Sequence, residues 1–83
     1  MKVTHEVKVY GHCPVDGRND SYDVTISTMK LLKVEDILSA INGLNWPLFQ
    51  ETMTQQLADA LGCHVKSVGY HSAIVIKHMA KRD

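Results

Sequence analysis

The sequence predicts an α+β domain with the element order ββααββ. Two segments with the two-residue periodicity of strands open the chain, two further strand-like segments close it, and two helical patterns lie between them. Strands grouped in this way favour one four-stranded antiparallel sheet that carries both helices on one face. The 83 residues are expected to form a single domain spanning residues 1–83.

The first two strands are predicted from alternation. Valine and histidine alternate with polar residues and tyrosine over residues 3–10, which is typical of a half-buried strand. Residues 11–21 then gather proline, glycine, asparagine and aspartate, the residues that turns favour. Alternation resumes over residues 22–27. We therefore expect a long polar loop between the first two strands.

Two helices are predicted in the middle of the chain. Apolar residues recur at helical spacing over residues 34–41, and Gly43 just beyond them is a stop signal. A second helical pattern covers residues 49–61. Pro47 precedes it in a position that a first helical turn allows, and Gly62 follows it at the position where left-handed glycines end helices.

The last two strands are predicted from composition. Residues 63–70 and 72–79 are rich in valine, isoleucine and tyrosine, and the second segment is nearly continuously apolar, as in a central strand. The sheet face without helices also needs a cover, which a chain of this length does not supply. We therefore expect a homo-oligomer in which neighbouring sheets cover one another or close into a barrel.

Composition argues against several classes of function. Nine Lys and Arg residues balance nine Asp and Glu residues, so the zero net charge does not point to a nucleic acid. The longest apolar stretch, residues 73–76, is far shorter than the ~20 residues that cross a bilayer. Residues 1–10 lack the apolar core of a secretory signal, and two cysteines are too few for a disulfide framework. We expect a cytoplasmic protein with reduced thiols.

The segment CPVDGRND, residues 13–20, places a thiol and a carboxylate in the predicted loop. The thiolate is the nucleophile of cysteine chemistry, and Asp20 is able to return beside Cys13 as a proton donor. Taken alone, the same residues also fit a buried thiol and a turn-forming aspartate.

This run resembles the CPVTGxxD signature of the nitrile reductases of queuosine biosynthesis. Residues 13–26 as a whole also resemble the matching loop and strand of their archaeal amidine-forming relatives. These are enzymes of the tunnelling fold, in which ββααββ subunits assemble into a barrel. The resemblance implies that Cys13 adds to the nitrile carbon of 7-cyano-7-deazaguanine, that Asp20 protonates the nitrogen, and that a covalent thioimide forms.

A second segment agrees with the first. Residues 49–61, FQETMTQQLADAL, resemble the substrate-anchoring helix of tunnelling-fold enzymes, which reads FHExxxNxIxxDL in the nitrile reductases and QERLTxQIAxAL in GTP cyclohydrolase I. Glu51 matches the anchoring glutamate. A carboxylate accepts two hydrogen bonds from the ring N–H and the exocyclic amine of a purine-like base. Without the resemblance, Glu51 is a solvated helix residue.

The last strand is similar to a strand of GTP cyclohydrolase I. Residues 74–79, IVIKHM, match VVIEAxHMCM, which implies that His78 contacts substrate. The zinc-ligating cysteine of that family falls on Ala80, so we do not expect zinc. The nitrogen and sulfur candidates lack close metal-ligand spacing; they are His12, Cys13, Cys63, His71 and His78. In one regular strand, His71 and His78 would point to opposite faces.

The leading interpretation is a 7-deazaguanine-pathway enzyme that forms the thioimide and then reduces it with NADPH or adds an amine to give an amidine. Residues 27–33, STMKLLK, replace the ESKSLK stretch that the reductases associate with NADPH. The substrate is a free base or nucleoside or is carried by nucleic acid such as tRNA, and we expect adjacent subunits to share each site. Alternatives are a GTP cyclohydrolase I-like enzyme acting on a pterin or guanine nucleotide, and a non-catalytic purine-binding protein.

Overall fold

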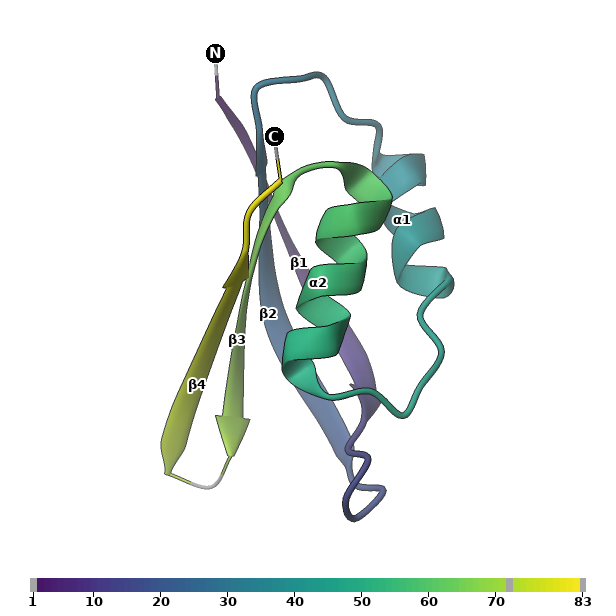
Figure 1. Cartoon of the computed structure of the whole chain (residues 1–83), viewed down its shortest axis with the longest axis vertical. Helices are drawn as coiled ribbons and strands as arrows, with labels where there is room; N and C mark the ends of the chain where they lie inside the picture. Colours follow the sequence, from purple (N-terminus) through teal and green to yellow (C-terminus); the bar gives the residue numbers. More distant parts are fainter. Residues whose placement is uncertain (1, 72, 83) are drawn as a thin grey trace.

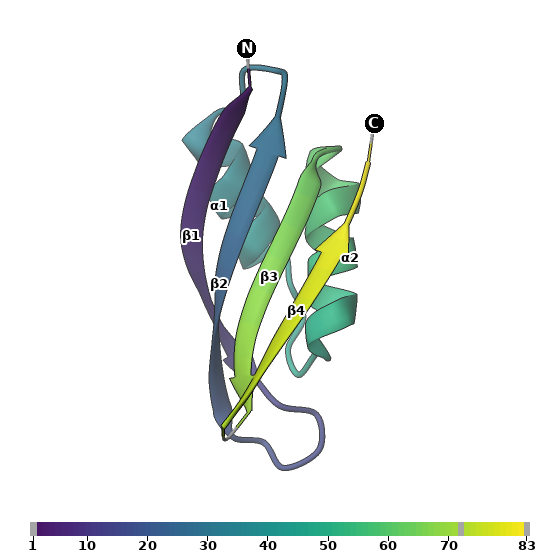
Figure 2. The same ribbon diagram turned by 90° about the vertical axis from the view of Figure 1, so that its left-hand side faces the viewer.

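The computed structural model of the protein describes residues 2–71 and 73–82 and contains one antiparallel sheet and two helices. The strands lie side by side in the order β1-β2-β3-β4, and both helices cover one face of the sheet (Figure 1, Figure 2). The predicted α+β class and element order are confirmed. The elements are β1 (Val3–His12), β2 (Asn19–Thr28), α1 (Val34–Asn42), α2 (Gln50–Leu61), β3 (His64–His71) and β4 (Ile74–Ala80).

The β1–β2 hairpin is longer than its sequence pattern indicates. Gly11 pairs with Asp20 and His12 pairs with Asn19, so the connecting loop comprises only residues 13–18. The predicted loop of residues 11–21 was therefore too long, and Asp20 belongs to β2. Gly17 has a φ of +72°. Glycine adopts this conformation without a steric penalty, which allows so short a connection to reverse the chain.

Both helices end at the predicted glycines. Gly43 caps α1, and Gly62 caps α2 with a φ of 63°, the left-handed conformation expected of it. The start of α2 differs from the prediction, because Phe49 is extended and Pro47 lies in the connection before it. Helical bonding begins only where the Met53 amide donates to the Phe49 carbonyl. In the described part of the chain, no helix is long and apolar enough to cross a membrane.

The core lies between the sheet and the helices. Two polar residues, Thr54 of α2 and Ser67 of β3, are buried in it, and their hydroxyl oxygens lie 2.6 Å apart. This hydrogen bond satisfies both groups away from water and ties α2 to β3. The largest fully buried apolar side chains around them are Val9, Val24, Ile26, Met53, Leu57 and Val65.

Strand β4 lies at an edge of the sheet, so the prediction of a central strand was wrong. Its apolar side chains are open to solvent in the single chain: Ile74, Val75 and Met79 are 64%, 49% and 61% exposed. An apolar run indicates that a strand is to be covered, but it does not say whether the cover comes from the same chain. The open face of the sheet and the β4 edge therefore remain uncovered within this chain.

Candidate functional site

One pocket gathers all four side chains that the sequence singles out. Its volume is about 410 Å³, and Cys13, Asp20, Glu51 and His78 all line it. The β1–β2 loop and the start of α2 lie at the same end of the molecule, which brings these distant segments together (Figure 1). The remaining lining residues are Pro14, Val15, Tyr22, Leu48, Phe49, Gln50 and Ile76. A single chain thus supplies all four residues, although adjacent subunits were expected to share them.

Cys13 is held by a loop that closes on itself. Its amide donates to the Arg18 carbonyl and its carbonyl accepts from the Gly17 amide, both at 2.9 Å. The Asp16 carboxylate accepts from the Arg18 amide at 3.0 Å and lies 3.4 Å from the Arg18 guanidinium. These contacts fix the loop backbone, so the half-buried Cys13 thiol faces the pocket from a defined position.

Asp20 lies beside a buried tyrosine. The Tyr22 hydroxyl is 3.5 Å from the Asp20 carboxylate, at the outer limit of a hydrogen bond. Burial raises the pKa of the Tyr22 phenol, and the charges of Asp20 and Cys13 raise it further. Tyr22 is therefore a neutral hydrogen-bond donor beside these two groups at physiological pH.

The Tyr22 ring is fixed by Trp46. The two rings stack with centroids 6.2 Å apart and planes 5° from parallel. The Trp46 ring in turn lies directly against Gly11, where a Cβ atom would overlap it. Glycine is required at this position because of the close approach, and the wall of the pocket depends on it.

The start of α2 presents two polar side chains to the pocket. Glu51 is exposed in the first helical turn, where the helix dipole favours a negative charge. Gln50 is half-buried, and its Nε2 donates to the Ile76 carbonyl at 3.0 Å and to the Ser67 hydroxyl at 3.1 Å. Gln50 thereby anchors the start of α2 to β3 and β4.

His78 faces the pocket from β4. It pairs with Ser67 of β3, whose side chain points to the helix-covered side, and His78 is half-buried there. The comparison of His71 with His78 assumed one continuous strand, but a turn separates them and His71 pairs with Ile74. The side chain of His71 lies outside what the structure describes. Among the described residues, no group of three His, Cys, Asp or Glu side chains is arranged to hold a metal ion.

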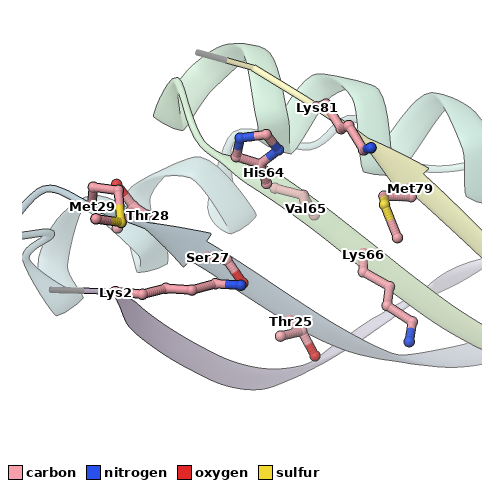
Figure 3. Close-up of a pocket in the computed structure, with 10 residues that line it drawn as sticks. All are labelled: Lys2, Thr25, Ser27, Thr28, Met29, His64, Val65, Lys66, Met79 and Lys81. Atoms are coloured by element: carbon pink, nitrogen blue, oxygen red, sulfur yellow. The ribbon is translucent and has the colours of Figure 1, made fainter.

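A larger hollow of about 520 Å³ lies at the other end of the sheet (Figure 3). Lys2, Lys66, Lys81 and His64 give it a basic character, with Met29 and Met79 nearby. The side chains that line it in the described part of the chain include no thiol and no carboxylate. It therefore lacks the nucleophile and the acid that the smaller pocket contains.

Of the pocket residues that were not identified as site residues from the sequence, three have aromatic or polar side chains: Tyr22, Phe49 and Gln50. Tyr22 fits a core strand position, and Phe49 fits the apolar face of a helix. Gln50 carries no signal of its own apart from its place beside Glu51. Their position in the site depends on the hairpin and on the docking of α2, which periodicity does not predict.

Neither a protein-family model nor a curated protein matches this sequence. Among solved structures, the fold is similar to that of the archaeosine synthase QueF-Like in its apo form, with a TM-score of 0.79. The alignment covers 98% of this chain and 92% of that chain, at 16% sequence identity. The chain therefore has the fold of that synthase over almost its whole length, and the predicted ββααββ tunnelling fold is confirmed for the single chain.

Proposed function

We propose that this protein is an enzyme of 7-deazaguanine metabolism that binds 7-cyano-7-deazaguanine and forms a covalent thioimide through Cys13. The observation that supports this proposal is the meeting of Cys13, Asp20 and Glu51 in one pocket, although most of β2 and the whole of α1 lie between Asp20 and Glu51 in the sequence. The similarity of the fold to that of an archaeosine synthase agrees with it.

Each residue has a defined role in this chemistry. The Cys13 sulfur bonds to the nitrile carbon while the Asp20 carboxylic acid gives its proton to the nitrile nitrogen, which leaves a neutral thioimide and an Asp20 carboxylate. Glu51 accepts hydrogen bonds from the amino-substituted edge of the base. His78 contacts the bound base from β4, and the exposed Phe49 ring offers it an aromatic surface.

The pocket of this chain suits amine addition better than reduction. NADPH is an anionic dinucleotide, yet the described side chains that line the pocket include no lysine or arginine. The segment between β2 and α1, which contains Lys30 and Lys33, lies at the opposite end of the molecule from the β1–β2 loop (Figure 1). The residues present do not fit this cofactor, and an amine remains as the second reactant.

The working form is a homo-oligomer. Strands β1 and β4 are free edges, and β4 carries exposed apolar side chains. Ile76 and His78 of β4 line the pocket, so a neighbour paired with this edge would lie beside the site. The bound base would then be enclosed between two subunits.

Intact-mass measurement after incubation with 7-cyano-7-deazaguanine tests the proposal. The wild-type protein should gain the mass of the ligand, and Cys13→Ala should not. Cys63→Ala is the matched control, because Cys63 is buried and its sulfur donates to the Leu61 carbonyl at 3.2 Å, away from the pocket; this variant should react like wild type. Asp20→Asn should slow the adduct by about 100-fold or more, the usual contribution of a general acid.

Two outcomes would contradict the proposal. Reversible binding of the base with no gain in mass would support a non-catalytic purine-binding protein. No interaction with the base by a folded protein would remove the nitrile chemistry altogether, and GTP turnover would then test the cyclohydrolase alternative.

A further inference from the structure

Asp20 and Tyr22 form a pair on one face of β2. Residues two apart in a strand point to the same side, and here that side is the one that the helices cover, where Tyr22 is buried and Asp20 is half-buried. The Tyr22 hydroxyl donates to the Oδ2 atom of Asp20 at 3.5 Å, and both residues line the candidate site. A buried side chain therefore supports the residue to which the proposed chemistry assigns the proton.

The Tyr22 ring is fixed from two directions. Trp46 stacks on it with planes 5° from parallel. Gly69 of β3 is its partner across the sheet, and a Cβ atom there would lie 2.9 Å from two carbons of the Tyr22 ring, closer than real contacts allow. The missing side chain at position 69 lets the ring lie close to the β3 backbone. The hydroxyl is thereby held in a defined place beside Asp20.

Packing alone does not explain the Tyr22 hydroxyl. A phenylalanine would keep the stack on Trp46 and fill the same space. A buried hydroxyl costs free energy unless it is hydrogen-bonded, and within the described residues that of Tyr22 bonds only to Asp20. Burial raises the pKa of Tyr22, as do the charges of Asp20 and Cys13. The phenol therefore keeps its proton and acts as a donor while Cys13 reacts.

We infer that Tyr22 is a positioning residue that holds Asp20 as the proton donor and stabilises the carboxylate that proton transfer leaves. The inference rests on the proposed thioimide chemistry. Because Oδ2 accepts the bond from Tyr22, Oδ1 carries the acid proton to the nitrile nitrogen. Hydrogen bonds to a carboxylate are shorter and stronger than those to a neutral acid, so the contact tightens as the proton leaves. The added stabilisation arises in the transition state.

The step needs no further reactant. The Cys13 thiolate forms the carbon–sulfur bond, and one π electron pair of the nitrile moves to its nitrogen. That nitrogen takes the proton of Asp20, so the negative charge passes from the sulfur to the Asp20 carboxylate. Tyr22 keeps its own proton throughout.

Several titratable groups surround Asp20, and all remain when Tyr22 is replaced. A difference between the pH profiles of wild type and Tyr22→Phe therefore reports the lost hydroxyl. In the described part of the chain, the groups that line the candidate site or the small cleft beside it together with Asp20 and Tyr22 are Cys13 from the β1–β2 loop, Glu51 from α2, Tyr70 from β3 and His78 from β4.

The experiment measures the rate of adduct formation with 7-cyano-7-deazaguanine as a function of pH, by intact mass. Asp20→Asn identifies the limb of the profile that depends on Asp20, because it removes that limb. In Tyr22→Phe this limb should move to higher pH by about one unit, which corresponds to about 1.4 kcal/mol, near the lower end for a hydrogen bond to a charged group. On the acid side of the limb, where Asp20 is protonated in both proteins, the adduct should form severalfold more slowly.

A second variant reaches the same contact from β3. Gly69→Ala places a methyl group against the Tyr22 ring and displaces the hydroxyl, so the limb should shift in the same direction. Added to Tyr22→Phe, it should shift the limb little further. Tyr10→Phe is the matched control, since Tyr10 is 72% exposed on β1 and does not line the pocket; its profile should match wild type. Urea unfolding establishes that each variant is folded.

Three outcomes are decisive. A limb that stays in place in folded Tyr22→Phe would overturn the role of Tyr22, even if the adduct forms more slowly, because a ring that only packs does not change the protonation of Asp20. Equal shifts in Tyr22→Phe and Tyr10→Phe would overturn it as well. Both results leave the thioimide chemistry intact, whereas a wild-type protein that forms no adduct at any pH would refute the proposed function itself.

Discussion

Substitution of Gly11 by alanine tests the wall of the pocket. The alanine methyl group would overlap the Trp46 ring, and this ring cannot move without losing its stack on Tyr22. Tyr22 is buried, so its ring cannot readily follow the half-buried Trp46 ring if that ring is displaced toward solvent. We expect Gly11→Ala to displace Trp46 and to destabilise the protein.

The magnitude follows from two contributions. Inserting a methyl group into a well-packed region costs about 1–3 kcal/mol. Loss of the aromatic pair adds about 0.5–1.5 kcal/mol. We expect the free energy of unfolding to fall by about 2–4 kcal/mol, which lowers the Tm of a domain of this size by at least about 10 °C.

Urea and thermal unfolding of three variants provide the measurement. Gly43→Ala is the control: a Cβ there lies 3.4 Å from the Ser39 carbonyl oxygen and Gly43 has a φ of −80°, so alanine should be tolerated. Trp46→Leu in the Gly11→Ala background should recover part of the lost stability, because it removes the overlapping ring. Equal stability of Gly11→Ala and Gly43→Ala would refute the close approach of Trp46 and the description of the wall that depends on it.

Three further substitutions test the core and the site. Leu57→Ala should lower the free energy of unfolding by about 2–5 kcal/mol, since Leu57 is fully buried; a urea midpoint close to wild type would contradict the packing of α2 on the sheet. Thr54→Val should cost about 1–3 kcal/mol because it leaves the buried Ser67 hydroxyl without this partner, and no change in urea unfolding would show that the bond is dispensable. Burial raises the pKa of Tyr22 above its ordinary value of 10.0, so the unfolded chain releases the phenol proton first and stability should fall as the pH rises above about 10. Tyr22→Phe should reduce this alkaline loss, and an identical pH dependence of its urea midpoint would contradict the raised pKa.

Periodicity predicted the fold well because each element obeys a local rule. The alternation of residues 3–10 matches the burial of β1, and Gly43 and Gly62 end their helices where the stop signals indicate. The end of the β1–β2 hairpin could not be predicted, because residues 11–21 are rich in residues that favour turns. Where the turn begins depends on the pairing of β1 with β2, which the sequence pattern does not show. The start of α2 was misplaced for a related reason: a proline is compatible with a first turn but does not require one.

The site was predicted on different grounds. Spacing alone left Cys13 and Asp20 open to a purely structural explanation, and the resemblance of CPVDGRND singled them out. Glu51 was singled out by the separate resemblance of residues 49–61, and spacing alone does not link it to Cys13 and Asp20. The structure brings all three to one pocket by folding the β1–β2 loop and the start of α2 toward the same end of the molecule.

Strand β4, which was wrongly predicted to be central, both lines the site and forms a free edge of the sheet at which a second copy could pair. Three antiparallel pairings separate β1 from β4, so the two edges run in opposite directions. A second copy in the same orientation can therefore add its β1 antiparallel to β4, and each addition leaves another free β4 edge until a ring closes. This pairing would satisfy the free backbone groups of β4 and cover its apolar side chains. Because Ile76 and His78 lie on this strand, the step that completes the sheet would also complete the pocket.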